Sequence, residues 1–190
     1  MRNKFQYWSI ALLFLVTCGV AHAHPGHVDG LLSGLTHPLS GGDHVLALVA
    51  IGIWACQFGG RATWLIPSSF MALMGVAALV GAAGFALPWG ETGIATSVLV
   101  VGLLIALSVR VSPLFGAMLV ALFALFHGNA HGIEMPVGIS GWQYGVGFVL
   151  VSVAVYGGGV LLGKQLHRHG WLLRVAGTAI AVSGAWLIAG

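Results

Sequence analysis

Long apolar runs separated by short polar breaks dominate this chain. The six runs cover residues 42–58, 64–87, 92–110, 112–131, 142–163 and 171–189. Each is close to the roughly 20 residues that an α-helix needs to cross a bilayer. The breaks are too short for a soluble domain. The pattern therefore predicts an all-α integral membrane protein, a bundle of six transmembrane helices that forms one domain over residues 24–190.

The N-terminus predicts a secretory signal peptide. A basic start is followed by an apolar run and by a small-x-small cleavage site at residues 21–23. Cleavage would remove residues 1–23 and leave His24 as the first residue of the mature chain. An uncleaved anchor helix is the alternative.

Composition and charge support the membrane class. Only 6% of the residues are charged, against roughly 25% in soluble domains. The formal charge of +3 is too small to suggest a nucleic-acid partner. If the mature N-terminus lies outside, every Lys and Arg falls on the cytoplasmic side and every Asp and Glu on the other, as the positive-inside rule requires. We therefore expect a multi-pass protein of the bacterial inner membrane.

This topology gathers ionisable residues in one layer on the periplasmic side. His37, Asp43 and His44 open the first run, while His127, His131 and Glu134 lie at the end of the fourth. Ionisable groups near a bilayer are costly, so they are candidates for function. Imidazoles and carboxylates are ligands for divalent transition metals. The six residues are therefore our predicted metal ligands.

The spacing in the fourth run supports a shared site. His127 and His131 are four residues apart, and Glu134 follows three residues later. If the helix persists, all three share one face. The alternative is that Gly132 ends the helix and that the histidines only complement its dipole.

The first cluster has its own structural alternative. Pro38 suits a helix start, and Ser40 with Asp43 matches a capping box. Capping does not account for His37 and His44, which are seven residues apart and would share one stripe of a single helix. Ligation and capping are compatible at Asp43, because a carboxylate at a helix start still attracts a cation.

Three further residues are weaker candidates. Glu91 opens the third run, where it either complements the helix dipole or assists a passing cation. The α-amine and imidazole of His24, with His27, form a candidate capture site at the mature N-terminus.

The two polar segments resemble a known family. HPLSGGDHVLALVAIGIWA at 37–55 and FHGNAHGIEMP at 126–136 look like the two signature segments of the HupE/UreJ family. That family is linked to hydrogenase and urease maturation, and its members are regarded as secondary nickel permeases. The resemblance implies functional roles for His37, Pro38, Asp43, His44, Phe70, Glu91, His127, His131 and Glu134. Leu48 stands where a methionine was expected, which removes one soft ligand.

These observations predict a permease rather than an enzyme. Its cargo is a divalent transition-metal ion, Ni²⁺ first and Co²⁺ or Zn²⁺ as alternatives, and we expect no catalytic cofactor. The competing hypothesis is an intramembrane zinc hydrolase, which uses the same residue types around an activated water. A bis-histidine haem protein is disfavoured, because the histidines crowd one end of the bundle. The sequence leaves the oligomeric state open, and a homo-oligomer is one of the alternatives.

Overall fold

The computed structural model describes residues 30–190, and the regular structure in this range is entirely helical. The helices are α2 (Gly30–Ser40), α3 (Gly42–Phe58), α4 (Ala62–Ala82), α5 (Gly90–Ala106), α6 (Pro113–Ile133), α7 (Gly141–Leu166) and α8 (Gly170–Ala189). The predicted signal peptide and the candidate ligands His24 and His27 lie outside the described residues.

Only some of these helices are long and apolar enough to cross a bilayer on their own. Helices α4, α6, α7 and α8 are each long and apolar enough to cross a bilayer. Helices α2 and α3 are long and apolar enough to cross a bilayer only when they are taken as one segment. They are bent by 78° at the break between them. Helix α5 is apolar, but its 17 residues are fewer than the roughly 20 that typically cross a bilayer. The described residues thus hold four candidate spans, or five with the bent pair, and the count of six stays a prediction.

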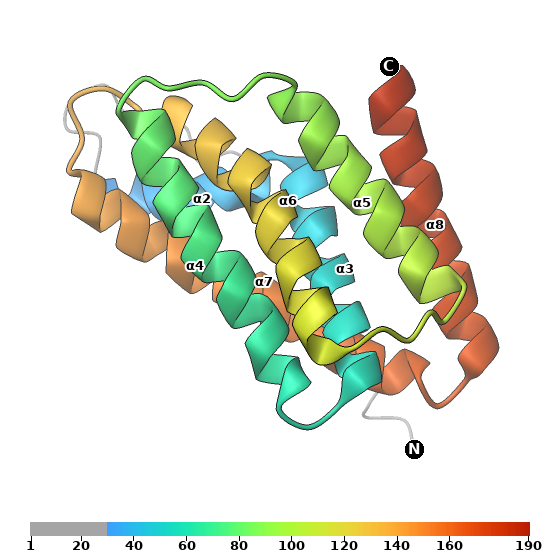
Figure 1. Ribbon diagram of the computed structural model, residues 1–190. Helices are drawn as coiled ribbons and strands as arrows, with labels where there is room; N and C mark the ends of the chain where they lie inside the picture. The colour runs from blue at the N-terminus through green and yellow to red at the C-terminus, as the bar shows by residue number, and fades with distance from the viewer. Residues whose placement is uncertain (1–29) are drawn as a thin grey trace, which may run out of the picture.

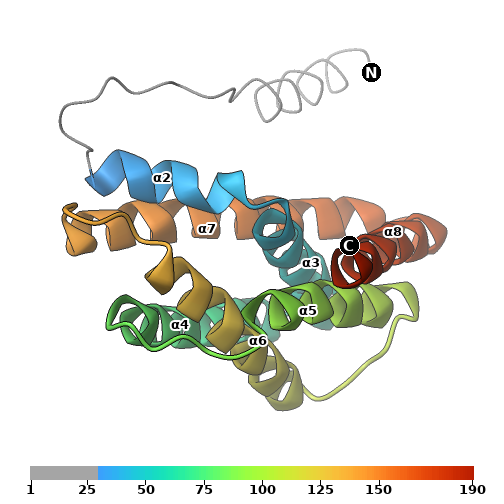
Figure 2. The same cartoon turned by 90° about the horizontal axis from the view of Figure 1, so that it is seen from above.

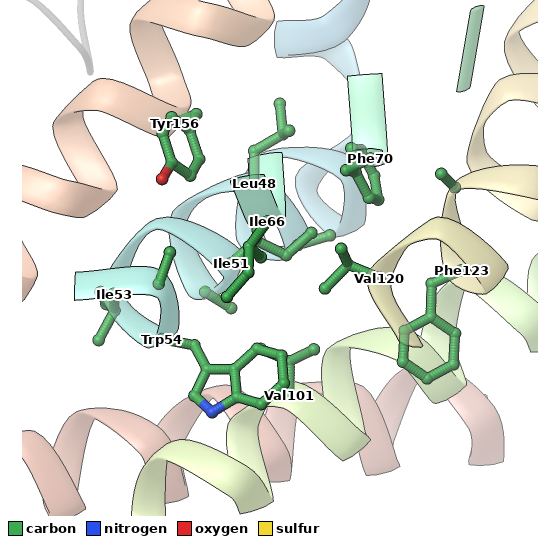
Figure 3. Packing of buried hydrophobic residues seen from close by; sticks show 14 of the residues in the cluster. Leu48, Ile51, Ile53, Trp54, Ile66, Phe70, Val101, Val120, Phe123 and Tyr156 are labelled. Carbon is green, nitrogen blue, oxygen red and sulfur yellow. The ribbon is translucent and has the colours of Figure 1, made fainter. Parts of the chain in front are cut away.

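The helices associate in pairs around α3. Helix α4 packs along α6, and α5 packs along α8 (Figure 1). Helices α2 and α3 both contact the long helix α7, and from above α2 lies beside α7 while α3 turns into the bundle (Figure 2). The core surrounds α3, where Ile51 and Trp54 pack among Ile66, Val101 and Val120 (Figure 3).

Two helices end earlier than the apolar runs suggested. Helix α4 stops at Ala82, and Gly84 then adopts a φ of 89° while the Phe85 N–H donates to the Val80 carbonyl at 3.2 Å. Helix α5 stops at Ala106 in the same way, with Ser108 at a φ of 52°. Such left-handed residues close a helix by capping its last carbonyls, whatever the hydropathy of the residues that follow.

Helix α2 was not predicted, and it corrects the reading of the first cluster. Pro38 lies inside α2, near its end, and does not start a helix. Helix α3 begins after Gly41, so His37 and His44 belong to two helices and not to one stripe. The short α2 is stabilised by packing: Gly34 is so close to α7 that a Cβ there would overlap the carbonyl oxygen of Tyr144.

Glycines bring α4 and α6 into equally close contact. A Cβ at Gly128 would overlap the carbonyl oxygen of Met74, and one at Gly132 would overlap that of Ala78. Small residues allow this approach of helix backbones in membranes, where packing replaces the hydrophobic effect. The adjacent face of α6, which carries His127 and His131, lies near His44 of α3.

Asn129 fixes the connection between α4 and α5. Its side-chain amide donates to the Phe85 carbonyl at 2.7 Å, and its side-chain oxygen accepts from the Leu87 N–H at 2.7 Å. These bonds satisfy backbone groups of a loop that leads to Glu91 at the start of α5.

We predict that Gly128→Ala destabilises the protein. The added methyl group has to displace backbone of α4, and overpacking of this kind costs about 1–3 kcal/mol of unfolding free energy. Thermal unfolding of the detergent-solubilised protein measures the effect. Gly75→Ala on α4 is the matched control, because a Cβ there meets no atom within 4 Å. Equal stability of the two variants would contradict the packing account.

Asn129→Leu should release the α4–α5 loop. The substitution leaves the Phe85 carbonyl and the Leu87 N–H without their side-chain partner, and the loss of one such hydrogen bond costs about 0.5–1.5 kcal/mol. Hydrogen exchange at the Leu87 amide should accelerate. In Asn129→Asp, a side-chain oxygen still accepts from Leu87, so protection there should persist. Unchanged exchange in the leucine variant would show that the loop holds without the amide.

Candidate metal site

Three imidazoles from three helices form a continuous chain. His37 Nε2 on α2 lies 2.8 Å from His131 Nδ1 on α6. His131 Nε2 lies 2.9 Å from His44 Nδ1 on α3. Both nitrogens of His131 are therefore engaged, and its ring joins the two halves of the α2–α3 break to α6.

Glu134 closes the outer end of this chain. Its Oε2 lies 3.2 Å from His37 Nε2 and 3.8 Å from His131 Nδ1. One ligand atom from each of the three residues falls within 4.8 Å of the others, a spacing that one metal ion can bridge. The side chain of Glu134 is 50% exposed and that of His37 21%. We name His37, His131 and Glu134 the outer triad.

His127 lies one helical turn before His131 and is completely buried. Its Nδ1 is 3.1 Å from the carbonyl oxygen of Phe123, one turn further back on α6. Its ring centroid is 5.5 Å from that of His44. Within the described residues, neither His44 Nε2 nor His127 Nε2 has a hydrogen-bond partner. We name His44 and His127 the inner pair.

A cavity of about 250 Å³ connects both groups of histidines. Asp43 and Glu91 add two further carboxylates to its wall. Its lining consists of His37, Ser40, Gly41, Asp43, His44, Glu91, Ile94, His127, Ala130, His131 and Glu134. The cavity is thus polar, although the bundle around it is apolar.

Aromatic rings enclose the histidines. Phe148 on α7 lies with its ring centroid 4.8 Å from His131 and 5.5 Å from His44. Tyr144, one turn earlier, is 5.7 Å from His37. Phe70 on α4 is fully buried and is 5.4 Å from His127. These rings, from α4 and α7, pack against the imidazoles.

The local sequence of α6 explains how its histidines reach the cavity. The helix continues to Ile133, so the expectation that His127, His131 and Glu134 share a face is correct. Gly132 does not end the helix and instead faces α4. In HGNAHG, each glycine follows a histidine, so the glycines contact one neighbouring helix while the histidines point into the cavity.

The capping alternative for the first cluster is not realised. The residue that precedes α3 is Gly41, and no side chain caps this helix. Asp43 Oδ1 accepts from the N–H of the adjacent His44 at 2.8 Å, while Ser40 Oγ donates to the His37 carbonyl at 2.7 Å. A carboxylate in the first turn of α3 still complements the helix dipole.

The structure thus brings all six predicted ligands, with Glu91, to one cavity, and Phe70 contacts His127. Leu48, where a methionine was expected, is buried in the core. Three residues near the site were missed: Asn129, Tyr144 and Phe148. The four-residue spacing of Tyr144 and Phe148 was visible in the sequence, but uniformly apolar runs do not reveal which face is buried.

The arrangement suits a small cation. Histidine nitrogen and carboxylate oxygen form the ligand set of borderline divalent metals such as Ni²⁺, Co²⁺ and Zn²⁺. The described residues that line the cavity include three carboxylates and no Lys or Arg, so its wall favours positive charge.

Comparisons with known proteins agree with these motifs. The family model described as "HupE / UreJ protein" matches residues 10–187. The chain is 42% identical over 190 residues to "Protein HupE" of Rhizobium leguminosarum bv. viciae, and the match covers 98% of this chain and 100% of that protein. No solved structure matches. The chain therefore belongs to the HupE/UreJ family.

Proposed function

We propose that this protein is a secondary permease that imports a divalent transition-metal ion, Ni²⁺ first, across the bacterial inner membrane. In this proposal the residues after the signal peptide form six spans and the cavity opens to the periplasm. The imported metal serves hydrogenase or urease maturation, the role linked to the family.

The observation that carries the proposal is the chain of imidazoles with a carboxylate at its open end. It begins at the half-exposed Glu134 and continues through His37 and His131 to the buried His44. A row of ligands that leads from the surface into a membrane bundle is what a permeating ion requires. A binding protein would need only the outer triad.

The carboxylates compensate the charge of the cargo. Moving a bare cation into an apolar environment is costly, and paired negative groups reduce that penalty. Glu134 lies at the mouth, and Asp43 and Glu91 line the same cavity. The imidazoles replace part of the hydration shell, so the ion loses water as it gains protein ligands.

The sequence limits the source of energy. No GxxxxGK[ST] segment is present, so this chain does not use ATP through a P-loop. Uptake then depends on the membrane potential, on proton exchange or on trapping of the metal inside the cell.

Removal of an outer ligand should abolish uptake. We predict that His131→Ala and Glu134→Gln each lower radiolabelled Ni²⁺ uptake by about ten-fold or more, the usual effect when a metal ligand or its support is lost. Uptake is measured in cells that express each variant at equal levels in the membrane. His167→Ala is the matched control, because this exposed histidine lies at the other end of α7. Normal uptake by both outer variants would refute the proposal.

Metal retention separates the permease from the zinc hydrolase. A hydrolase holds its catalytic zinc with three protein ligands and keeps it through purification. A permease has to release its cargo, so we expect the purified protein to bind Ni²⁺ reversibly and to carry less than one equivalent of metal. Elemental analysis of the protein as isolated provides the measurement. One tightly held zinc per chain, with no Ni²⁺ uptake, would favour the hydrolase.

A further inference from the structure

We propose that the cargo ion occupies two successive positions in the cavity, and that the inner position is formed by the Nε2 atoms of His44 and His127. This inference rests on the proposed permease function. The outer position is the outer triad of His37, His131 and Glu134. The ion thus passes from a half-exposed site to a buried one.

The hydrogen bond of His127 sets the tautomer of its ring. A carbonyl oxygen only accepts, so the Nδ1 that lies 3.1 Å from the Phe123 carbonyl has to carry the hydrogen. In the neutral ring, Nε2 then presents a lone pair. This is the arrangement of metal-binding histidines, whose second nitrogen typically donates to a backbone carbonyl or a carboxylate. No donor within the described residues meets that lone pair, although His127 is completely buried.

The spacing of the two rings suits a shared ion. Metal–imidazole bonds are about 2.1 Å long, so two rings that bind one ion have centroids about 4.5–6.5 Å apart. The centroids of His44 and His127 are 5.5 Å apart. His44 Nε2 is likewise buried and without a partner among the described residues. Asp43 lines the same cavity, so a carboxylate is close to the inner pair.

Water completes the coordination. The proposed inner position has only two protein ligands, fewer than the four to six that these metals take. The cavity of about 250 Å³ has room for several water molecules of about 30 Å³ each. A partly hydrated ion is held more weakly than in a complete protein cage, which favours onward release.

The bond between His131 and His44 makes the two positions alternatives. When His131 Nδ1 binds the outer ion, its Nε2 carries the hydrogen and donates to His44 Nδ1, so the hydrogen of His44 lies on Nε2 and blocks the inner position. When His44 Nε2 binds the ion, its Nδ1 donates to His131 Nε2, and His131 carries its hydrogen on Nδ1. In the transfer His44 Nε2 releases one proton to cavity water, the shared proton crosses from His131 Nε2 to His44 Nδ1, and His131 Nδ1 takes one proton from cavity water, so both rings stay neutral.

Asparagine substitutions test the inner position. Asn places its amide near the Nδ1 position of histidine, so His127→Asn can keep the donor to the Phe123 carbonyl while it lacks Nε2. His44→Asn can likewise keep the partner of His131. We expect both variants to bind Ni²⁺ at the outer triad with unchanged affinity, measured by titration of the purified protein in detergent. Their Ni²⁺ uptake should fall by about ten-fold or more.

The outcomes distinguish this inference from the proposed function. Normal uptake by a folded His127→Asn protein, together with loss of uptake in Glu134→Gln, would overturn the inner position and leave the permease intact. Loss of Ni²⁺ affinity in His127→Asn equal to that in Glu134→Gln would also overturn it, because it would indicate one shared site. If His127→Asn does not fold, His44→Asn decides by the same two measurements. Normal uptake by Glu134→Gln and His131→Ala would refute the permease itself.

Discussion

A ring nitrogen buried in an apolar helix bundle is costly unless it has a hydrogen-bond partner. Both ring nitrogens of His131 have such a partner. The ring contacts His37 on α2 at 2.8 Å and His44 on α3 at 2.9 Å. These two contacts hold the halves of the broken α2–α3 segment against α6. The bend of 78° is thereby stabilised by the same groups that make the site. The candidate ligands are thus also residues that hold the helices together.

The break between α2 and α3 also orients backbone charge toward the cavity. The C-terminal end of α2 carries partial negative charge, which favours a cation beside His37. The N-terminal end of α3 carries partial positive charge, which Asp43 in its first turn offsets. Discontinuous helices with their ends at an ion site are a recurring solution in transporters. The glycines of α2 and α6 bring these helices into close contact with α7 and α4, respectively.

Much of this architecture was accessible from the sequence. Apolar runs predicted the positions of α3 through α8, because lipid requires long apolar segments. Residue type and spacing predicted which polar side chains lie together at the cavity, because few polar residues occur in such a chain. Helix α2 escaped prediction, since its stability comes from contact with α7 at Gly34 and not from its own hydropathy. The alternative of a capping box at Ser40 and Asp43 is not realised, because α2 extends to Ser40 and the residue before α3 is Gly41.

Tertiary contacts account for what the sequence left open at the site. Seven-residue spacing placed His37 and His44 on one stripe, whereas the structure joins them through a third histidine from α6. The wall formed by Tyr144 and Phe148 depends on the rotation of α7, which a uniformly apolar helix does not encode. Asn129 lay inside a recognised motif, but its partners in the α4–α5 loop are more than 40 residues away in the chain.

The central claim is that histidine nitrogen and carboxylate oxygen of this cavity bind the cargo. X-ray absorption spectroscopy of the purified, Ni²⁺-loaded protein tests it most directly. The account predicts a first shell of nitrogen and oxygen only, with the outer-shell scattering of imidazole, and loss of that imidazole signal in His131→Ala. A sulfur ligand, or an imidazole signal that persists unchanged in His131→Ala, would contradict it.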